Sequence, residues 1–443
     1  MQSTGPSPRD CDVLVIGGGP AGSTVSTLLA RQGHRVVLLD KDVHPRFHIG
    51  ESLLPANMPL LDRLGVGEAV RKIGMLKAGA EFVSPQHEHT QIYYFADAWD
   101  KSMPTAFQVK RADFDHVLLR NAAEQGVEVH EGCTARELHW SADGTEVDSV
   151  TAVDAQGQAT EWRPRFLVDA SGRDTFLSAR LKTKIKNPDH NSAAVYAHFR
   201  GARRLEGADE GNITIFWFDH GWFWFIPLSD GATSVGMVTW PYHMKTRGGR
   251  PLQDFLMDNI RSCPRLAERL AAADMVTPVE ATGNYSYLST QSHGRNFVML
   301  GDAYAFIDPV FSSGVWMAMS SAEIGARTIH TCLNEPARAR SALRHFHRHM
   351  QHGPREFSWF IYRMANPTMR SFFMAPANHL RMKEALLSVL AGDLYDSTPI
   401  WRSLRAFKTM YYAFNLSKPV RSWRAWRQRR RNISPATGPV SNA

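Results

Sequence analysis

The chain has 443 residues, a formal net charge of +8 and 43% hydrophobic side chains. This length predicts two or three domains of about 100 to 200 residues each, and the apolar content is ample for a core. Residues 1–9 lack the basic and apolar segments of a leader, and no later stretch reaches the roughly 18 apolar residues of a membrane span, so we expect neither secretion nor membrane spanning.

The four cysteines lie far apart in the sequence, at Cys11, Cys133, Cys263 and Cys332. None of their spacings is typical of paired metal ligands, so we expect no zinc site and no bound metal. Cysteines without a disulfide framework favour a reducing compartment, and the expected location is therefore cytoplasmic.

A glycine-rich segment follows the first apolar run. Residues 12–16 predict a short strand, and residues 17–22 read Gly-Gly-Gly-Pro-Ala-Gly before a helical stretch. Gly17 permits a tight turn, Gly19 lets the backbone approach a pyrophosphate, and Gly22 lets the helix pack close to the strand. Strand, turn and helix in this order predict a dinucleotide site at the helix N-terminus.

A second apolar run, residues 35–39, ends in Asp40. Its separation from Gly17 fits the expected offset of about 20 residues, which places the Asp40 carboxylate to accept hydrogen bonds from ribose hydroxyls. This fingerprint does not separate FAD from NAD, and the alternative is a glycine-rich loop that binds nothing.

Three later segments favour FAD. Residues 111–115 open a helical stretch, residues 166–173 predict a strand that leads into a turn, and residues 298–303 repeat that pattern. In this order they resemble flavoproteins related to aromatic hydroxylases, in which the late aspartate, here Asp302, meets the ribityl or phosphate part of FAD.

This resemblance implies an α/β fold with an FAD-binding Rossmann-like domain of the aromatic-hydroxylase, or glutathione-reductase-like, type. An antiparallel β-sheet substrate domain is inserted in it, and a helical C-terminal region follows. We expect a discontinuous FAD-binding domain (1–80, 105–180 and 280–335), a substrate domain (81–104 and 181–279) and a helical cap (336–417). In the substrate domain the predicted strands are residues 193–200, 212–218, 221–227 and 233–239.

Residues 418–443 carry seven basic side chains and no acidic one. We interpret this segment as a solvated, disordered basic tail and expect no nucleic acid partner. Trp423 and Trp426 lie between the arginines, which leaves nucleic acid, an anionic membrane surface or an acidic carrier protein as alternatives.

Two motifs narrow the function. Trp222-x-Trp224-x-Ile226-Pro227 lies in a predicted strand, so both indoles point to the same face, where aromatic side chains ordinarily belong to a core. Residues 301–314 combine a Gly-Asp pair with Phe306-x-x-Pro309-x-x-Ser312-x-Gly314. Together the motifs resemble those of flavin-dependent halogenases.

The resemblance implies a division of labour among these residues. Trp222 and Trp224 keep the organic substrate away from the flavin, so that oxygen goes to halide and not directly to the substrate. The turn with Ser312, Ser313 and Gly314 offers backbone N–H groups to the flavin and halide, although the two serines are also ordinary helix-capping residues. The residues predicted to contact FAD are Gly17, Gly19, Gly22, Asp40, Arg46, Ser52, Arg111, Asp302, Pro309 and Gly314; the halide ligands are Ser313 and Gly314.

The family also uses a lysine to carry or activate hypohalous acid. We choose Lys77, which lies between an amphipathic stretch, residues 60–73, and Ala78-Gly79-Ala80. Burial in this apolar setting would lower the pKa of Lys77 and favour a nucleophilic amine or a directed hydrogen bond. Lys72 is the nearby alternative. The predicted catalytic residues are thus Lys77, Trp222, Trp224 and Ser312.

One position departs from the tryptophan-specific branch, where a glutamate directly precedes the motif serine. Here that residue is Phe311. The missing carboxylate suggests an electron-rich phenol or pyrrole as substrate, and the motif is similar to the branch that acts on such rings, several of them tethered to acyl carrier proteins.

We therefore expect an FADH2- and O2-dependent halogenase of natural-product biosynthesis that uses chloride or bromide. Because the chain has one dinucleotide fingerprint, a separate NAD(P)H-flavin reductase would supply FADH2. The alternatives are an FAD-dependent monooxygenase or reductase on the same scaffold, and a non-catalytic flavoprotein scaffold.

Overall fold

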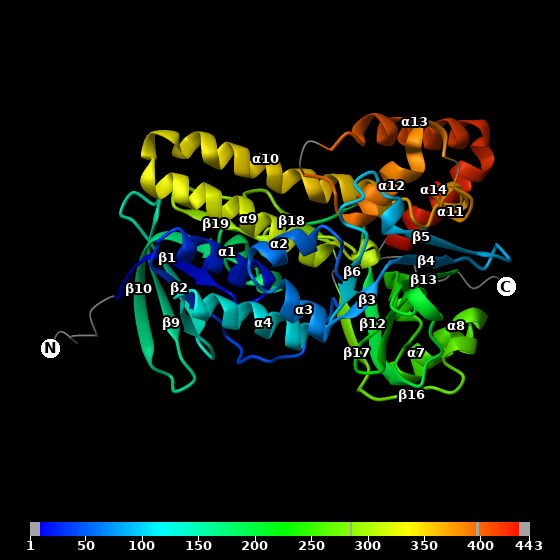
Figure 1. Cartoon of the computed structure of the whole chain (residues 1–443), viewed down its shortest axis with the longest axis horizontal. Helices are drawn as coiled ribbons and strands as arrows, with labels where there is room; N and C mark the ends of the chain where they lie inside the picture. The colour runs from blue at the N-terminus through cyan, green and yellow to red at the C-terminus, as the bar shows by residue number, and fades with distance from the viewer. Residues whose placement is uncertain (1–8, 189, 284–285, 377, 396–397, 434–443) are drawn as a thin grey trace.

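The computed structural model describes residues 9–188, 190–283, 286–376, 378–395 and 398–433. Residues 1–8, for which the sequence predicts no leader, and residues 434–443 of the predicted tail lie outside the described residues. Figure 1 shows a sheet with helices on the left, a second sheet on the right and a layer of helices across the top. No helix in the described ranges is both long and apolar enough to cross a membrane.

The first sheet is built around parallel strands at the start of the chain. Its order is β7 (Glu128–His130), β2 (Val36–Leu39), β1 (Arg9–Ile16), β10 (Ala159–Asp169), β9 (Val147–Val153) and β8 (Thr134–Trp140), and β19 (Phe297–Met299) pairs with the end of β10. β1 pairs in parallel with both β2 and β10. Because β2 and the end of β1 are buried on both faces, they read as continuous apolar runs, as parallel strands do.

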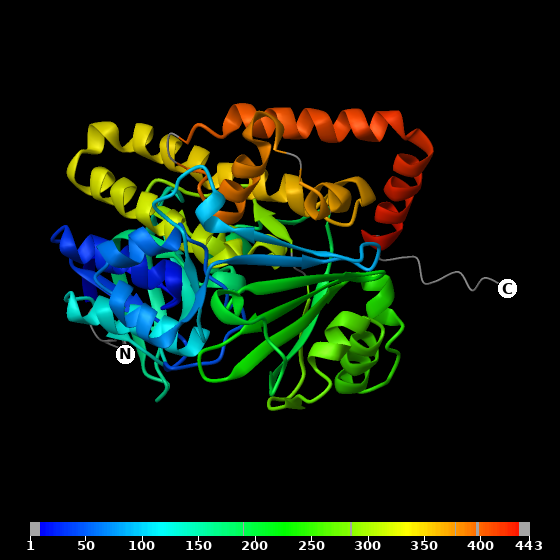
Figure 2. The same cartoon turned by 45° about the vertical axis from the view of Figure 1, so that its right-hand side comes forward.

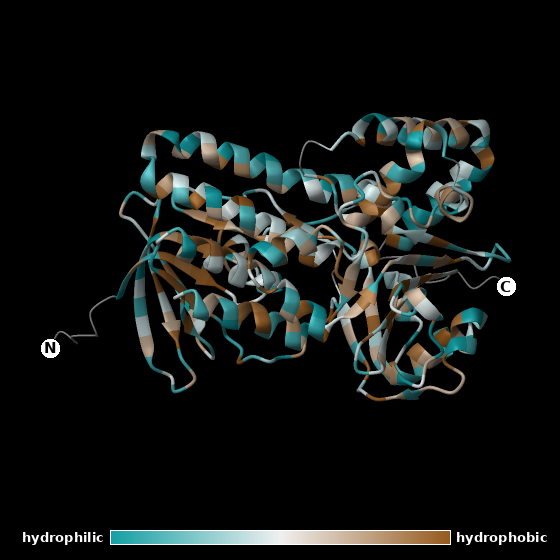
Figure 3. Ribbon diagram, in the orientation of Figure 1, coloured by the Kyte–Doolittle hydropathy of each residue, from teal (hydrophilic) through white to brown (hydrophobic). Residues whose placement is uncertain are grey.

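A layer of helices covers this sheet. The packing order is α4 (Arg111–Glu124), α1 (Pro20–Arg31), α9 (Ser313–Asn334) and α10 (Pro336–Ile361). Figure 3 shows hydrophobic residues gathered in the strands beneath this layer and a hydrophilic outer surface on α10. The predicted α/β class is confirmed.

The second sheet contains all four strands predicted for the substrate domain. Its order is β16 (Asp274–Met275), β12 (Ala193–Arg200), β15 (Ala232–Thr239), β14 (Gly221–Pro227), β13 (Ile213–Phe218), β4 (Gly79–Val83) and β5 (Thr90–Tyr94), with β17 (Glu280–Gly283) also on β12. Two expectations were wrong in detail. β4 and β13 pair in parallel, so the sheet is mixed, and β17 belongs to this sheet although residues 280–283 were assigned to the FAD-binding part.

Helices pack on both faces of the second sheet. α7 (Leu252–Arg261) and α8 (Pro264–Arg269) cover one face, and the C-terminal helices α11 (Pro367–Met374), α12 (Met382–Ala391) and α13 (Trp401–Ser417) cover the other. Figure 2 shows these C-terminal helices above the sheet. Short elements complete the fold: β3 (Met75–Lys77) with β6 (Ala106–Gln108), the strands β11 (Lys184–Lys186), β18 (Tyr287–Ser289) and β20 (Ala305–Phe306), and the helices α5 (Phe176–Arg180) and α6 (Pro241–Lys245).

Two helical expectations need correction. The single amphipathic stretch predicted at residues 60–73 is two short helices, α2 (Asn57–Arg63) and α3 (Gly67–Ile73), because Gly65 between them has a left-handed φ of +79°. The predicted disordered tail is also wrong for residues 419–433, which form α14 (Pro419–Ile433). Pro419 suits the first turn of a helix, and Ser422 anchors α14 by donating a hydrogen bond from Oγ to the Asn415 carbonyl at 2.8 Å.

Candidate active site

The turn between β1 and α1 requires glycine at two positions for reasons of backbone geometry. Gly17 has φ +104°, and a Cβ there would lie 2.3 Å from the carbonyl oxygen of Ala170. A Cβ on Gly22 would lie 1.8 Å from the carbonyl oxygen of Gly17. The turn and the close approach of helix to strand therefore depend on these glycines, as their spacing predicts.

A cavity of about 590 Å³ opens beside this turn. Gly19 and Gly314 line it from the N-terminal ends of α1 and α9. A Cβ on Gly19 would meet only Arg46 Nη2, at 3.7 Å, and a Cβ on Gly314 would have no described heavy atom within 4 Å. Both glycines keep open a space in which two helix N-termini favour negative charge.

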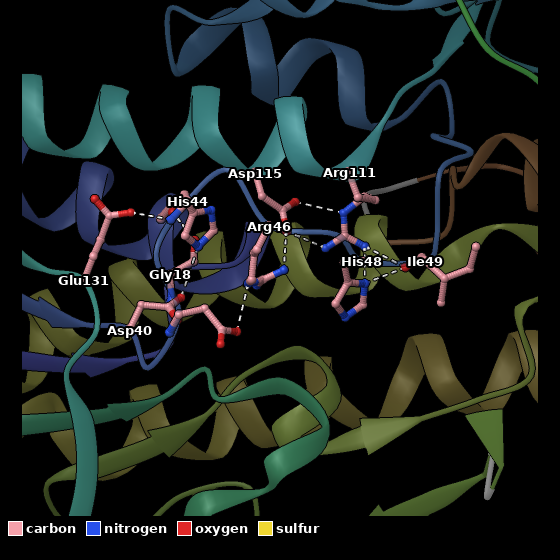
Figure 4. Close-up of polar contacts among 11 residues, drawn as sticks. Gly18, Asp40, His44, Arg46, His48, Ile49, Arg111, Asp115 and Glu131 are labelled. Carbon is pink, nitrogen blue, oxygen red and sulfur yellow. Dashed lines mark hydrogen bonds and ion pairs between the residues drawn. The ribbon is translucent and has the colours of Figure 1, made fainter. Parts of the chain in front are cut away.

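Asp40 follows β2, lines the cavity and stabilises the glycine-rich turn. Its carboxylate accepts hydrogen bonds from the backbone N–H of Gly18 at 2.6 Å and of Asp42 at 2.9 Å, and His44 Nε2 lies 3.3 Å away (Figure 4). Burial opposes ionisation, but the hydrogen bonds from His44 and these two amides outweigh it and lower the pKa of Asp40. The carboxylate predicted to accept from ribose hydroxyls thus already accepts from the protein.

Two arginines predicted to contact FAD share one buried carboxylate. Arg111 donates from Nε and Nη2 to the two oxygens of Asp115, at 2.8 and 2.9 Å, and Arg46 Nη1 lies 3.4 Å from the same group (Figure 4). Burial and the neighbouring Arg111 charge lower the pKa of His48 to about 4. Both arginines line the cavity and hold positive charge there, while neutral His48 adds none.

Asp302 faces the cavity from the turn after β19, in the 3-10 helix η4 (Gly301–Ala303). Burial raises the pKa of this carboxyl to about 6, and the charges of Arg111 and Arg173 oppose the shift. Asp302 can accept hydrogen bonds from a ligand hydroxyl, which is the chemistry predicted for it.

The segment that follows β20 bends sharply into α9. Pro309 begins the 3-10 helix η5 (Pro309–Phe311), Ser312 then adopts the left-handed conformation with φ 56° and ψ 24°, and α9 starts at Ser313. The Ser312 N–H donates to the Pro309 carbonyl at 2.8 Å, so the groups available to an anion are the N–H groups of Ser313 and Gly314 in the first turn of α9, where backbone donors have no intrahelical acceptor. Ser312 and Gly314 line the cavity, whereas the Ser313 side chain is buried and its Oγ has no hydrogen-bond partner in the described ranges.

A buried polar cluster braces this bend and was not predicted. Asp308 Oδ2 lies 2.9 Å from His190 Nε2 and accepts a hydrogen bond from Ser192 Oγ at 3.0 Å, and Asp308 Oδ1 accepts from the Val310 N–H at 3.2 Å. The imidazole of His190 stacks on Tyr362 with ring centroids 5.6 Å apart. His190 and Ser192 lie more than 100 residues from Asp308 in the sequence, so no local pattern marks this cluster.

Trp222 and Trp224 point to the same face of β14, as predicted, and both are buried and line the cavity. Their ring centroids are 6.1 Å apart, and Trp224 Nε1 donates to Ser234 Oγ at 3.1 Å. Both belong to the large apolar core shared with the C-terminal helices. They are thus core residues and cavity-wall residues at the same time.

Gly236 on the neighbouring β15 makes room for Trp224, because a Cβ there would lie 2.1 Å from the indole ring. We expect Gly236→Ala to displace the indole and to lower the free energy of unfolding by about 1 to 3 kcal/mol, as overpacking does. If the indole wall has the role that the resemblance implies, the amount of halogenated product per FADH2 consumed should also fall. Gly283→Ala is the matched control, since its Cβ would meet no described heavy atom within 4 Å. Equal product yields from both variants would contradict the role given to the tryptophan wall.

Lys77 is buried at the end of β3, behind the cavity wall. Its Nζ donates to Ser52 Oγ at 2.9 Å and to the Leu53 carbonyl at 3.0 Å. Burial lowers the pKa of Lys77 to about 7, as the apolar setting predicts. Lys72 is exposed and pairs with Glu68 at 2.9 Å. Ser52 lines the cavity and Lys77 does not, so the amine lies one hydrogen bond behind the surface that a ligand meets.

Most predicted site residues surround one cavity. Those that line it are Gly17, Gly19, Asp40, Arg46, Ser52, Arg111, Trp222, Trp224, Asp302, Pro309, Ser312 and Gly314. Lys77, Gly22 and Ser313 lie behind the wall. The volume, the two helix N-termini, the arginines and the open space at Gly19 fit an anionic dinucleotide such as FAD.

Comparison with known proteins agrees with this fit. The FAD binding domain family matches residues 10–351. The flavin-dependent halogenase armH3 of Armillaria mellea is 38% identical over 73% of this chain and 68% of its own length. The 1H-pyrrole-2-carbonyl-[peptidyl-carrier protein] chlorinase of Pseudomonas fluorescens is 30% identical over 88% of this chain and 91% of its own length.

A solved structure of a related enzyme has a similar fold. The myxobacterial chondrochloren halogenase CndH is 32% identical, superposes with a TM-score of 0.78, and is matched over 89% of this chain and 93% of its own. Extensive sequence identity and a shared fold, together with both tryptophans at the cavity wall, place the chain in a single family: it belongs to the flavin-dependent halogenases.

Proposed function

We propose that this halogenase chlorinates or brominates a phenolic or pyrrolic ring, which reaches it free or as a thioester on a carrier protein. The observation that carries the proposal is that one cavity has the tryptophan pair on its wall and the Ser52–Lys77 hydrogen bond behind that wall. The pyrrole chlorinase among the relatives supports the ring class and the carrier.

The cofactor contacts follow from the cavity wall. The turn at Gly17 and Gly19 and the N-terminus of α1 would hold the pyrophosphate, Arg46 and Arg111 would neutralise its charge, and Asp302 would accept from ribityl hydroxyls. Bound FADH2 supplies the two electrons with which O2, halide and a proton yield hypohalous acid and water. A separate NAD(P)H-flavin reductase would provide FADH2, because the sequence contains one glycine-rich strand-turn-helix fingerprint.

The halide would bind at the bend before α9. The backbone N–H groups of Ser313 and Gly314, in the first turn of α9, would stabilise the anion there, because the Ser312 N–H already donates to the Pro309 carbonyl at 2.8 Å. The Ser313 side chain lies outside the cavity, so its predicted contact with halide would come from the backbone N–H.

Lys77 would position and activate hypohalous acid for attack by the ring. A neutral amine has two donors, which can satisfy Ser52 Oγ and the Leu53 carbonyl and leave the lone pair for the halogen. Access requires Ser52 to rotate, because its hydroxyl stands between the amine and the cavity. Phe311 stands where the tryptophan-specific branch has a glutamate, and the missing carboxylate favours a substrate that needs no added base.

The direct test is incubation of the enzyme with FAD, a flavin reductase, NADH and either chloride or bromide. Candidate phenols and pyrroles are offered both free and on a carrier protein, and the products are analysed by mass spectrometry. The proposal predicts replacement of a ring hydrogen by halogen. Hydroxylated or reduced products without halogen would favour the monooxygenase or reductase alternative, and protein that does not bind FAD would favour the scaffold alternative.

Halogenation should depend on pH through Lys77. Because burial lowers the pKa of Lys77 to about 7, the neutral amine predominates above that pH. We expect halogen transfer to increase as pH rises through about 7, with no such change in the rate at which O2 reoxidises bound FADH2. Transfer that instead falls as pH rises would mean that the ammonium form is the active one.

The lowered pKa of Lys77 also predicts that the stability of the folded protein depends on pH. An unfolded lysine has a pKa of about 10.4, so the cost of burying the charge is fully present below pH 7 and is lost as pH rises from about 7 to about 10.4. Lys77→Met should therefore raise the free energy of unfolding most at pH 6 and progressively less at pH 8 and pH 9. A pH-independent effect in denaturant titrations would contradict the buried, uncharged lysine.

A further inference from the structure

The basic charge of the chain is segregated at its C-terminal end. The last 47 residues contain ten lysines and arginines and no acidic residue, whereas the 396 residues before them have two more acidic than basic side chains. Within this region the structure describes α13, which runs along the top of Figure 2, and α14, the red helix at its right-hand side.

α14 has one packed face and one outward face. Ser422, Ala425, Arg429 and Asn432 are buried or partly buried. The outward residues are exposed and recur at helical spacing: Val420, Trp423, Arg424, Arg427 and Arg430. We call the surface made by these five residues, Leu416 and Trp426 the C-terminal patch.

The patch concentrates exposed apolar side chains. Of the fourteen large apolar side chains exposed in the described part of the chain, four belong to the patch and two more, Tyr412 and Phe414, lie just before it in the sequence. Trp423 is 53% exposed and Trp426 is 51% exposed, and Arg427 and Arg430 each lie 4.6 Å from one of these rings. Exposed tryptophan and arginine side chains without acidic neighbours are typical of energetically important protein interfaces.

An apolar hollow adjoins this region. A cavity of about 260 Å³ lies among α11, α12 and α13 and is lined by Phe372, Met382, Phe407 and Phe414, among others. Phe414 at its rim is 46% exposed. Such a hollow can receive an apolar side chain of a protein partner.

The packed face of α14 is connected to the braced bend of the active site. The Arg429 guanidinium lies 5.4 Å from the centroid of the Tyr362 ring, and Tyr362 stacks on His190, which contacts Asp308 at 2.9 Å. Asp308 precedes Pro309 on the cavity wall. A partner on the patch would therefore lie over the residues that hold this bend.

We propose that the C-terminal patch docks an acidic carrier protein, which presents the ring substrate as a thioester to the cavity. This inference rests on the proposed function and adds the surface that recognises the carrier. Charge complementarity with the three arginines of the patch favours an acidic protein, and the two tryptophans supply the desolvated centre of an interface. A membrane-surface helix would need a broad apolar face, which the arginines interrupt.

The test compares two triple variants of the whole enzyme. Arg424→Glu/Arg427→Glu/Arg430→Glu reverses three charges on the patch. Arg340→Glu/Arg344→Glu/Arg348→Glu reverses three exposed charges on α10, at the opposite end of the molecule in Figure 1. Binding to a peptidyl carrier protein that bears a pyrrole-2-carbonyl thioester is measured by calorimetry at low and high salt, with anionic phosphatidylserine vesicles and a single-stranded oligonucleotide as competitors.

We expect the patch variant to bind the carrier about 10-fold or more weakly and the α10 variant to bind like wild type, with wild-type binding weakened by salt. Halogenation of the free ring should be unchanged in both variants. The inference is overturned if wild type does not bind the carrier, if the patch variant binds as tightly, or if vesicles or oligonucleotide displace the carrier. These outcomes leave halogenation of the free ring, and thus the proposed function, to be judged independently.

Discussion

Replacing Lys77 by alanine is expected to abolish halogenated product while flavin chemistry continues. The variant should bind FAD and support O2-driven reoxidation of FADH2 at close to wild-type rates, because the amine lies behind Ser52 and outside the cofactor cavity. Product should fall by about 100-fold or more, as it does when a nucleophilic or general acid/base group is lost. Stopped-flow absorbance measures the flavin steps and mass spectrometry measures the product.

Lys72→Ala is the matched control. Lys72 is exposed and pairs with Glu68 on the surface, so its loss should be near neutral. Lys77→Met fills most of the space left by the lysine and separates loss of the amine from loss of packing. Wild-type product from Lys77→Ala and none from Lys72→Ala would move the assignment to Lys72, and full activity in both would exclude a lysine relay.

Replacing Gly19 by leucine should give a folded protein that does not bind flavin. A Cβ at Gly19 would meet only the flexible end of Arg46, at 3.7 Å, so the apo fold tolerates it. The side chain would instead fill the space into which a pyrophosphate must approach the backbone. Thermal unfolding should stay near that of wild-type apoprotein, while flavin absorbance and affinity are lost.

Gly22→Leu provides the contrast within the same turn. Its Cβ would lie 1.8 Å from the carbonyl oxygen of Gly17, so this variant should fail to fold and not merely lose flavin. If Gly19→Leu binds FAD with unchanged affinity, the pyrophosphate does not approach α1 at this position.

The local features of the fold could be predicted because short-range geometry determines them. Gly17 needs a positive φ and Gly22 a close contact wherever a strand turns directly into a helix. The same holds for Trp222 and Trp224, since residues two apart on a strand must share a face. The apolar residues around Lys77 in the sequence also predict its burial, and burial lowers its pKa.

The remaining features depend on contacts between distant segments. Spacing places Asp40 near the turn, but it does not reveal that the Gly18 and Asp42 amides donate to its carboxylate. That Ser52 stands between Lys77 and the cavity, and that His190 braces Asp308, are equally consequences of tertiary packing. The density of like charge in residues 419–433 predicts disorder, whereas the hydrogen bond from Ser422 to Asn415 that anchors α14 is a contact that the sequence does not reveal.

The most direct test of the account follows bromide and isotopically labelled O2 into one product. The enzyme is supplied with FAD, a flavin reductase, NADH, bromide and an electron-rich phenol or pyrrole under labelled O2, and the product is examined by high-resolution mass spectrometry. We predict a product that shows the isotope doublet of bromine and contains no labelled oxygen, because oxygen is transferred to halide and leaves as water. A product that contains labelled oxygen and no bromine would contradict the halogenase assignment and identify the chain as a monooxygenase.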